Sequence, residues 1–170
     1  GDTGTDTLAG GLGNDTLAGG SNADTIQGGA GNDTFRIDLA TDVSGLVETI
    51  DGGEDIDTLD FQSSSVGGVA DVTSAVITSV ERLLLGGAEL VITAAQLGEF
   101  NAISGTGFIE RIIVGAGTAD LSGASIAGID EFRGSNGNNR IDLTDVASGQ
   151  TIDGRGGNDV IIGTLANDLI

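Results

Sequence analysis

The chain has 170 residues, 31 of them glycine, and it lacks lysine, cysteine, histidine, proline, methionine, tryptophan and tyrosine. Its 26 acidic residues stand against six arginines, and the formal charge of −20 repels nucleic acid and anionic lipid but favours cations. Without cysteine, neither disulfides nor thiolate metal sites are possible, so a different crosslink is expected. No apolar run reaches about 18 residues, so no membrane span is predicted.

Residues 1–36 consist of four consecutive nine-residue blocks. Each block begins with glycine and has aspartate in the sixth place, threonine in the seventh and an apolar residue in the eighth. The sixth-place residues are Asp6, Asp15, Asp24 and Asp33. Glycine permits turn conformations, whereas threonine and apolar residues favour a short strand, so each block predicts one turn and one strand. This fixed order outweighs two alternatives, a disordered chain and a flexible linker.

Two blocks are expected to complete one coil, which predicts that aspartates two blocks apart lie side by side. Asp6 then stacks beside Asp24, and Asp15 beside Asp33, while the apolar eighth places face the interior. Such rows of carboxylates repel one another. Calcium, which takes about six to eight oxygen ligands, relieves that repulsion with carboxylates and turn carbonyls, and the smaller octahedral magnesium fits less well.

The four blocks, GDTGTDTLA, GGLGNDTLA, GGSNADTIQ and GGAGNDTFR, resemble the nonapeptide repeats of repeats-in-toxin (RTX) proteins, whose parallel β-roll binds Ca²⁺ in its turns. The resemblance implies that the sixth-place aspartates ligate calcium and that the glycine-rich turns supply carbonyls. The turn glycines concerned are Gly4, Gly11, Gly13, Gly20, Gly29 and Gly31. Asn22 and Ala23 interrupt the third block, so a weaker site is expected there. The resemblance also implies signal-peptide-independent secretion from a bacterium and folding on calcium outside the cell.

The repeat pattern returns after a gap. Residues 52–60 (GGEDIDTLD) supply Gly53 and Asp57, and we predict that Asp57 stacks on Asp33 while residues 38–50 replace one turn by a loop. Near the C-terminus, residues 154–162 and 163–170 place Asp159 and Asp168 as further calcium ligands. Residues 134–142 have Asn139 in the sixth place, so this turn is expected to be calcium-poor or empty, because an amide carries no charge.

The middle of the chain, residues 61–133, lacks these turns, and packing is expected to hold it instead of calcium. Three similar motifs, at residues 80–83, 109–112 and 129–132, are interpreted as equivalent strands of successive larger coils, with a longer step from the first to the second than from the second to the third. A short helix is predicted within residues 93–100, with Thr93 as its N-cap. The apolar runs at 83–85, 90–92 and 112–114 are expected to form the core.

Catalysis is a second possible role for the carboxylates of the middle. Glu81, Glu110 and Asp130, beside Arg82 and Arg111, could supply an acid and a base. We interpret them instead as an exposed ladder of ion pairs, because no histidine, lysine, tyrosine or cysteine is present to act as a tuned base or nucleophile. The sequence therefore predicts that the chain is not an enzyme.

Together these features predict one all-β domain, a parallel β-solenoid or β-roll with several calcium-binding turns at both ends and larger apolar coils between them. The predicted segments are residues 1–36 (repeats), 37–60 (loop insertion and one repeat), 61–133 (larger coils) and 134–170 (degenerate and regular repeats). The array stops in mid-repeat, so we expect a fragment of a larger protein, with neighbouring modules or copies of the chain packing end to end or laterally.

Two functions follow from this architecture. The first is an extracellular, calcium-dependent structural module of a surface-layer, adhesin or filament protein. The alternative is a C-terminal accessory module of a type I secreted hydrolase or polysaccharide-modifying enzyme. Glycan binding by the middle coils is a weaker third possibility, because the chain has few aromatic residues.

Overall fold

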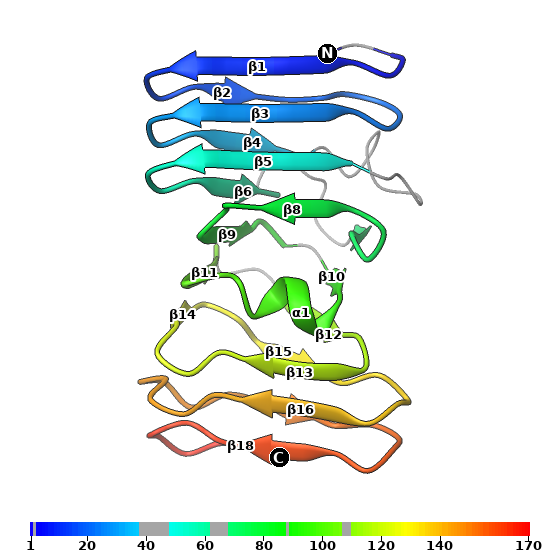
Figure 1. Cartoon of the computed structure of the whole chain (residues 1–170). Helices are drawn as coiled ribbons and strands as arrows, with labels where there is room; N and C mark the ends of the chain where they lie inside the picture. The colour runs from blue at the N-terminus through cyan, green and yellow to red at the C-terminus, as the bar shows by residue number, and fades with distance from the viewer. Residues whose placement is uncertain (2, 38–47, 62–67, 88, 107–109) are drawn as a thin grey trace.

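The structure is a computed structural model that describes residues 1, 3–37, 48–61, 68–87, 89–106 and 110–170. Its strands pair in parallel and stack one above another along a single axis (Figure 1). Among the described residues, one short helix interrupts the stack. The predicted parallel β-solenoid is therefore confirmed.

The described strands form four parallel sheets along the faces of the solenoid. The first sheet contains β1 (Thr7–Leu12), β3 (Thr25–Ala30), β5 (Thr49–Glu54) and β8 (Val76–Thr78). The second contains β2 (Thr16–Leu17), β4 (Thr34–Arg36), β6 (Thr58–Asp60), β9 (Arg82–Leu85), β11 (Ala102–Gly105) and β14 (Ser125–Ala127). The third contains β7 (Val69–Asp71), β10 (Glu89–Ile92), β12 (Arg111–Val114), β15 (Glu131–Arg133) and β17 (Ile152–Asp153). The fourth contains β13 (Gly117–Asp120), β16 (Asn139–Asp142) and β18 (Val160–Ile162).

The coils that contain β1 to β6, called the first coils below, have two faces, as the nine-residue period predicts. β1 pairs with β3 so that Thr7 lies opposite Thr25, and β2 pairs with β4 so that Thr16 lies opposite Thr34. Both pairs join threonines that are two blocks apart in the sequence, so two blocks complete one coil. The apolar eighth places face inward, where Ile26 and Phe35 are buried.

The coils of the middle have three faces. The second and third sheets run side by side here, because β9 and β10, β11 and β12, and β14 and β15 follow each other within successive coils. The remaining face is filled by the end of the first sheet, then the helix α1 (Ala94–Leu97), then the start of the fourth sheet. Figure 1 shows this column as β8, α1 and β13.

The predicted helix and its N-cap at Thr93 are confirmed. Thr93 Oγ1 accepts from the backbone N–H of Gln96, and the side chain of Gln96 accepts in turn from the N–H of Thr93. Gln96 also donates through Nε2 to the carbonyl oxygens of Val72 (2.9 Å) and Ala75 (2.8 Å). This one side chain thus joins the helix to the segment that leads into β8.

One predicted equivalence in the middle is confirmed and the other is wrong. Arg111 lies opposite Glu131 in the third sheet, as the step between the second and third motifs predicts. Arg82, however, lies in β9 of the second sheet, so it is not equivalent to Arg111, whose partner in the preceding coil is Glu89. The error arises because each three-faced coil contains two strands that begin with similar residues. The longer step, from the first motif to the second, therefore joined strands on different faces. Ile109 of the motif lies outside the described residues.

The predicted loop at residues 38–50 needs a partial correction. Residues 38–47 lie outside the described residues, but Thr49 and Ile50 begin β5. Ile50 lies opposite Ile26 and is buried, because the interior needs an apolar side chain at that level. The predicted stacking of Asp57 on Asp33 is confirmed, since the next residue, Thr58, pairs with Thr34.

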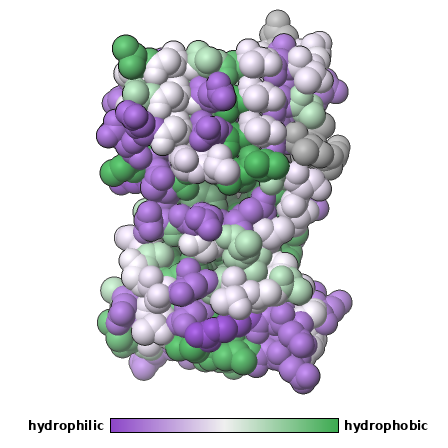
Figure 2. Space-filling view, in the orientation of Figure 1, coloured by the Kyte–Doolittle hydropathy of each residue, from purple (hydrophilic) through white to green (hydrophobic). Residues whose placement is uncertain are grey.

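The core alternates along each strand, with every second side chain pointing inward. The apolar runs predicted to supply it do so through six fully buried residues: Leu83, Leu85, Leu90, Ile92, Ile112 and Val114. On the outside, hydrophilic residues are spread along the whole face seen in Figure 2, between separate hydrophobic patches.

Replacing Leu83 by alanine tests this packing. The side chain is fully buried between neighbours in the second sheet, so Leu83→Ala should lower the free energy of unfolding by about 2–5 kcal/mol. The control is Val69→Ala, because Val69 is 53% exposed. Urea unfolding in calcium measures both, and an equal cost for the two variants would contradict the assigned core.

Candidate metal sites

Acidic residues form rows at the edges of the sheets, each one residue before a strand begins. In the second sheet the row is Asp15, Asp33, Asp57 and Glu81. The backbone N–H of each member donates to the carboxylate of the next: Asp15 to Asp33 Oδ1 (2.8 Å), Asp33 to Asp57 Oδ1 (2.7 Å) and Asp57 to Glu81 Oε2 (2.9 Å). These bonds fix one oxygen of each receiving carboxylate along the axis of the solenoid.

The first sheet has a matching row, Asp6, Asp24 and Glu48. The N–H of Asp6 donates to Asp24 Oδ1 (2.7 Å), and the N–H of Asp24 donates to Glu48 Oε2 (3.0 Å). The sequence pattern missed Glu48 and Glu81, which extend the two rows without belonging to a nonapeptide block. The signal available was an acidic residue directly before a strand, as in Glu48-Thr49 and Glu81-Arg82.

The second oxygen of these carboxylates is the most informative feature of the rows. Oδ2 of Asp15, Asp24, Asp33 and Asp57 is buried and has no hydrogen-bond partner. Asp24, Asp33 and Asp57 are only 2%, 1% and 0% exposed. A buried carboxylate oxygen without a donor is unfavourable, so a bound cation would stabilise the fold at these positions.

The first-place glycine of each block leaves room for this oxygen. A Cβ added to Gly28 would lie 2.3 Å from Asp33 Oδ2 and 2.4 Å from the carbonyl oxygen of Gly52. The seven glycines predicted to line the turns all have positive φ: Gly4, Gly11, Gly13, Gly20, Gly29, Gly31 and Gly53. Coils also approach closely here, since a Cβ on Gly29 would lie 2.2 Å from Gly11 O. These turns therefore bring backbone oxygens and a carboxylate oxygen together.

The donor set fits calcium. Within the described residues, no three histidine, cysteine, aspartate or glutamate side chains gather at one point, so a cation would bind mixed carboxylate and backbone oxygens. Such a set of hard oxygen donors suits Ca²⁺ better than a transition metal. The ligands in the first coils would be the free oxygens of Asp15, Asp24, Asp33 and Asp57 with the turn carbonyls. Ligation by these individual residues stays a prediction.

The electrostatics of Asp57 agree with a need for a cation. Burial raises the pKa of Asp57, and the negative charges of Asp33, Glu81 and Asp55 raise it further, against the hydrogen bond from the Asp33 N–H. In the absence of metal, the fold therefore favours the protonated form of Asp57 more than the unfolded chain does. A bound dication would remove that preference, because it stabilises the charged form.

The C-terminal coils have similar rows of more varied residues, on the third and fourth sheets. Asp159 and Asp168, both predicted as ligands, lie in different rows: Asp159 Oδ1 accepts from Asn139 N (2.9 Å), and Asp168 Oδ1 accepts from Gln150 N (2.9 Å). In the third sheet, Glu110 N donates to Asp130 Oδ2 (2.7 Å). The expected stacking of Glu110 and Asp130 is thus confirmed, but Glu81 belongs to another row.

Glu110 is a position for which the sequence predicted no metal. Its side chain is fully buried, and Oε1 accepts from Thr106 N (2.8 Å) and Thr106 Oγ1 (3.3 Å). Oε2 is buried without a partner, like the aspartate oxygens of the first coils. One of its two oxygens therefore still lacks a donor.

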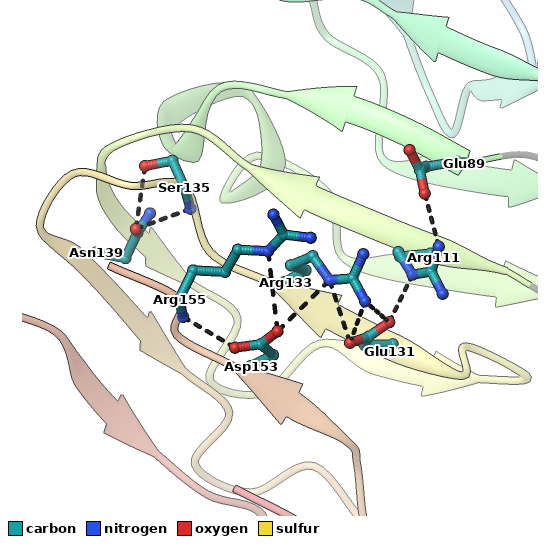
Figure 3. A network of polar contacts seen from close by, with 8 residues as sticks. All are labelled: Glu89, Arg111, Glu131, Arg133, Ser135, Asn139, Asp153 and Arg155. Atoms are coloured by element: carbon teal, nitrogen blue, oxygen red, sulfur yellow. Dashed lines mark hydrogen bonds and ion pairs between the residues drawn. The ribbon is translucent and has the colours of Figure 1, made fainter. Parts of the chain in front are cut away.

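A ladder of ion pairs crosses the third sheet, as predicted, but most of its members differ from those expected. Arg111 forms ion pairs with Glu89 (2.7 Å) and with Glu131. Arg133 forms an ion pair with Glu131 (2.9 Å), and its Nε lies 3.7 Å from Asp153 Oδ2 (Figure 3). Burial opposes ionisation of Glu131, yet the hydrogen bonds from Arg111 and Arg133 hold its pKa below the usual value. The paired charges of this ladder stabilise neighbouring strands.

The comparisons with known proteins agree with this geometry. The family model of the RTX calcium-binding nonapeptide repeat matches in four copies, which cover residues 1–35, 126–144 and 150–170. Repeats of this family bind Ca²⁺ in several turns and are typical of secreted bacterial proteins. No curated protein and no solved structure matches the chain. In the part of the chain that the structure describes, no helix is long and apolar enough to cross a membrane.

Replacing Asp57 by asparagine tests whether its buried Oδ2 is a calcium ligand. The amide keeps an oxygen for the Asp33 N–H and replaces the unpartnered oxygen by a donor, so without metal the variant should be more stable than the wild type by about 1–3 kcal/mol. Its stabilisation by calcium should shrink. Glu99→Gln, which removes a charge from an exposed residue outside the rows, is the control. Thermal unfolding in calcium and in chelator measures both effects.

The wild type and Asp57→Asn should also differ in how their stability depends on pH. Because the pKa of Asp57 is raised in the fold, the metal-free wild type should gain stability as the pH falls through that pKa, and lose it as the pH rises. Asp57→Asn should lack this component. The interpretation would be contradicted if the variant and the wild type showed the same calcium response and the same pH dependence.

Arg111→Met tests the ladder. Loss of the guanidinium should raise the pKa of Glu131. On acidification, the variant should therefore lose the stability that ionised Glu131 contributes at a higher pH than the wild type does. The total cost should be about 1 kcal/mol or less, because the pair is partly exposed. Arg36→Met is the control for loss of charge. Carboxyl-detected NMR titration follows the pKa, and an unchanged value would refute the assigned contact.

Proposed function

We propose that this chain, whose residues 1–35, 126–144 and 150–170 are RTX calcium-binding repeats, is a structural segment of an extracellular protein that folds on calcium after secretion. The RTX repeats themselves mark an extracellular calcium-binding module. The observation that carries the proposal further is the set of buried, unpartnered Oδ2 atoms of Asp15, Asp24, Asp33 and Asp57. At low calcium these charges would oppose folding, and at high calcium they would hold successive turns together.

A structural role is supported by the form of the solenoid. Parallel strands stack along one axis, and calcium between the turns would add crosslinks along that axis (Figure 1). The resulting segment would be a stiff spacer within a surface-layer, adhesin or filament protein. The arginines of the ladder in Figure 3 contact carboxylates of their own sheet, which suits stabilisation of the solenoid.

Circular dichroism and small-angle scattering of the chain in calcium and in chelator test the proposal. In calcium, a β spectrum and the dimensions of a compact rod are expected. In chelator, the β signal should fall and the radius of gyration should rise, because the aspartate rows of the first coils repel. Magnesium at the same concentration is the control and should restore less structure. A chain that is equally folded in chelator and in calcium would refute calcium-coupled folding.

A further inference from the structure

Two turns near the C-terminus satisfy their sixth-place side chain with protein donors. The clearer case is Asn139, which is 3% exposed. Its Oδ1 accepts from Ser135 N (3.0 Å) and Ser135 Oγ (3.2 Å), while its Nδ2 donates to the carbonyl oxygens of Val114 (3.3 Å) and Gly115 (2.9 Å). The NH₂ group thus contacts backbone oxygens of the preceding coil, where a cation would otherwise be needed.

Asp168 is satisfied in a related way, although it carries a charge. Thr164 donates its N–H to Asp168 Oδ2 (2.8 Å) and its hydroxyl to Oδ1 (2.8 Å), and Oδ1 also accepts from Gln150 N. Both oxygens therefore have donors. Neither Asp168 nor Asn139 has an unpartnered buried oxygen of the kind found in the first coils.

The difference between these two turns and those of the first coils follows from the residue in the second place of each block. In the blocks of Asp15, Asp24, Asp33 and Asp57 this place is a glycine with positive φ: Gly11, Gly20, Gly29 and Gly53 respectively. A glycine has no hydroxyl to offer. The blocks of Asn139 and Asp168 have Ser135 and Thr164 there, which donate both N–H and hydroxyl to the sixth-place side chain. The block of Asp159 has Arg155 with positive φ and resembles the first coils.

We infer that the C-terminal coils close two of their turns with Ser135–Asn139 and Thr164–Asp168 hydrogen bonds in place of calcium, so that this end stays folded when calcium is withdrawn. The apolar core is buried in both regions, since Ile26 and Phe35, like Ile141 and Leu143, are at most 1% exposed. The division therefore lies in the turns. The inference rests on the proposed calcium-coupled folding and restricts it to the N-terminal coils.

Hydrogen–deuterium exchange of the whole chain, with and without calcium, tests the inference. In chelator, the amides of β1 to β6 should lose protection at least tenfold, while those of β16 should keep most of theirs. Equal loss at both ends would overturn the inference but leave the proposed function standing. Equal retention at both ends would contradict both. Greater loss at the C-terminal end would also overturn the inference.

Asn139→Asp provides the decisive variant. It replaces the two N–H donors by an oxygen that faces the carbonyls of Val114 and Gly115, so protection of β16 in chelator should fall at least tenfold and return in calcium. Asn101→Asp adds the same charge at an exposed position and should leave β16 unchanged. Unchanged protection in Asn139→Asp, or loss that calcium does not restore, would overturn the inference.

A second pair of variants examines the other turn. Thr164→Val removes the hydroxyl donor to Asp168, whereas Thr164→Ser keeps it. In chelator, the Leu169 amide, which donates to the carbonyl of Gln150, should lose protection in the valine variant and keep it in the serine variant. Identical exchange in the two variants would overturn the assignment for this turn.

Discussion

The constraint on which the solenoid depends is the stacking of like charges. Parallel strands in register lie about 4.8 Å apart, so a residue type repeated in every coil forms a continuous row. In this chain the repeated residue is an aspartate placed directly before a strand, and its backbone N–H binds the carboxylate of its neighbour. Each coil thereby fixes a negative charge beside the next, and every such charge needs a compensating donor.

The chain meets this need in several ways along its length. In the first coils, glycines keep the turns open and Asp24, Asp33 and Asp57 retain a buried oxygen without a donor. In the middle, Thr106 satisfies one oxygen of Glu110 and leaves the other unpartnered. Near the C-terminus, an amide replaces the carboxylate at Asn139. A single repeating geometry therefore accommodates both metal-dependent and self-sufficient turns.

The sequence predicted most of the fold because the repeat has an unbroken period in the first coils. The coil of two blocks, the pairing of Asp57 with Asp33 and the N-cap at Thr93 all follow from local patterns. The equivalence of the strands that begin at Arg82 and Arg111 failed because the period is lost in the middle, and similar strand starts on two faces cannot be told apart by spacing. Glu48 and Glu81 were missed because they lie outside any nonapeptide block.

The chemistry of individual turns was harder to predict than their positions. The Asn139 turn was expected to be calcium-poor or empty, whereas Asp168 was predicted as a ligand. In the structure both side chains have protein donors, because Ser135 and Thr164 occupy the second place. The identity of that residue is visible in the sequence. Its effect depends on the direction of a backbone N–H, which only the folded turn reveals.

We propose that buried aspartate oxygens of the N-terminal coils are calcium ligands and that the Asn139 and Asp168 turns bind no calcium. A crystal structure grown in calcium, with anomalous scattering used to locate the ions, tests this claim most directly. Ions are expected beside Oδ2 of Asp15, Asp24, Asp33 and Asp57, and none is expected at Asn139 or Asp168. Ions at Asn139 and Asp168, or first coils free of calcium, would contradict the claim.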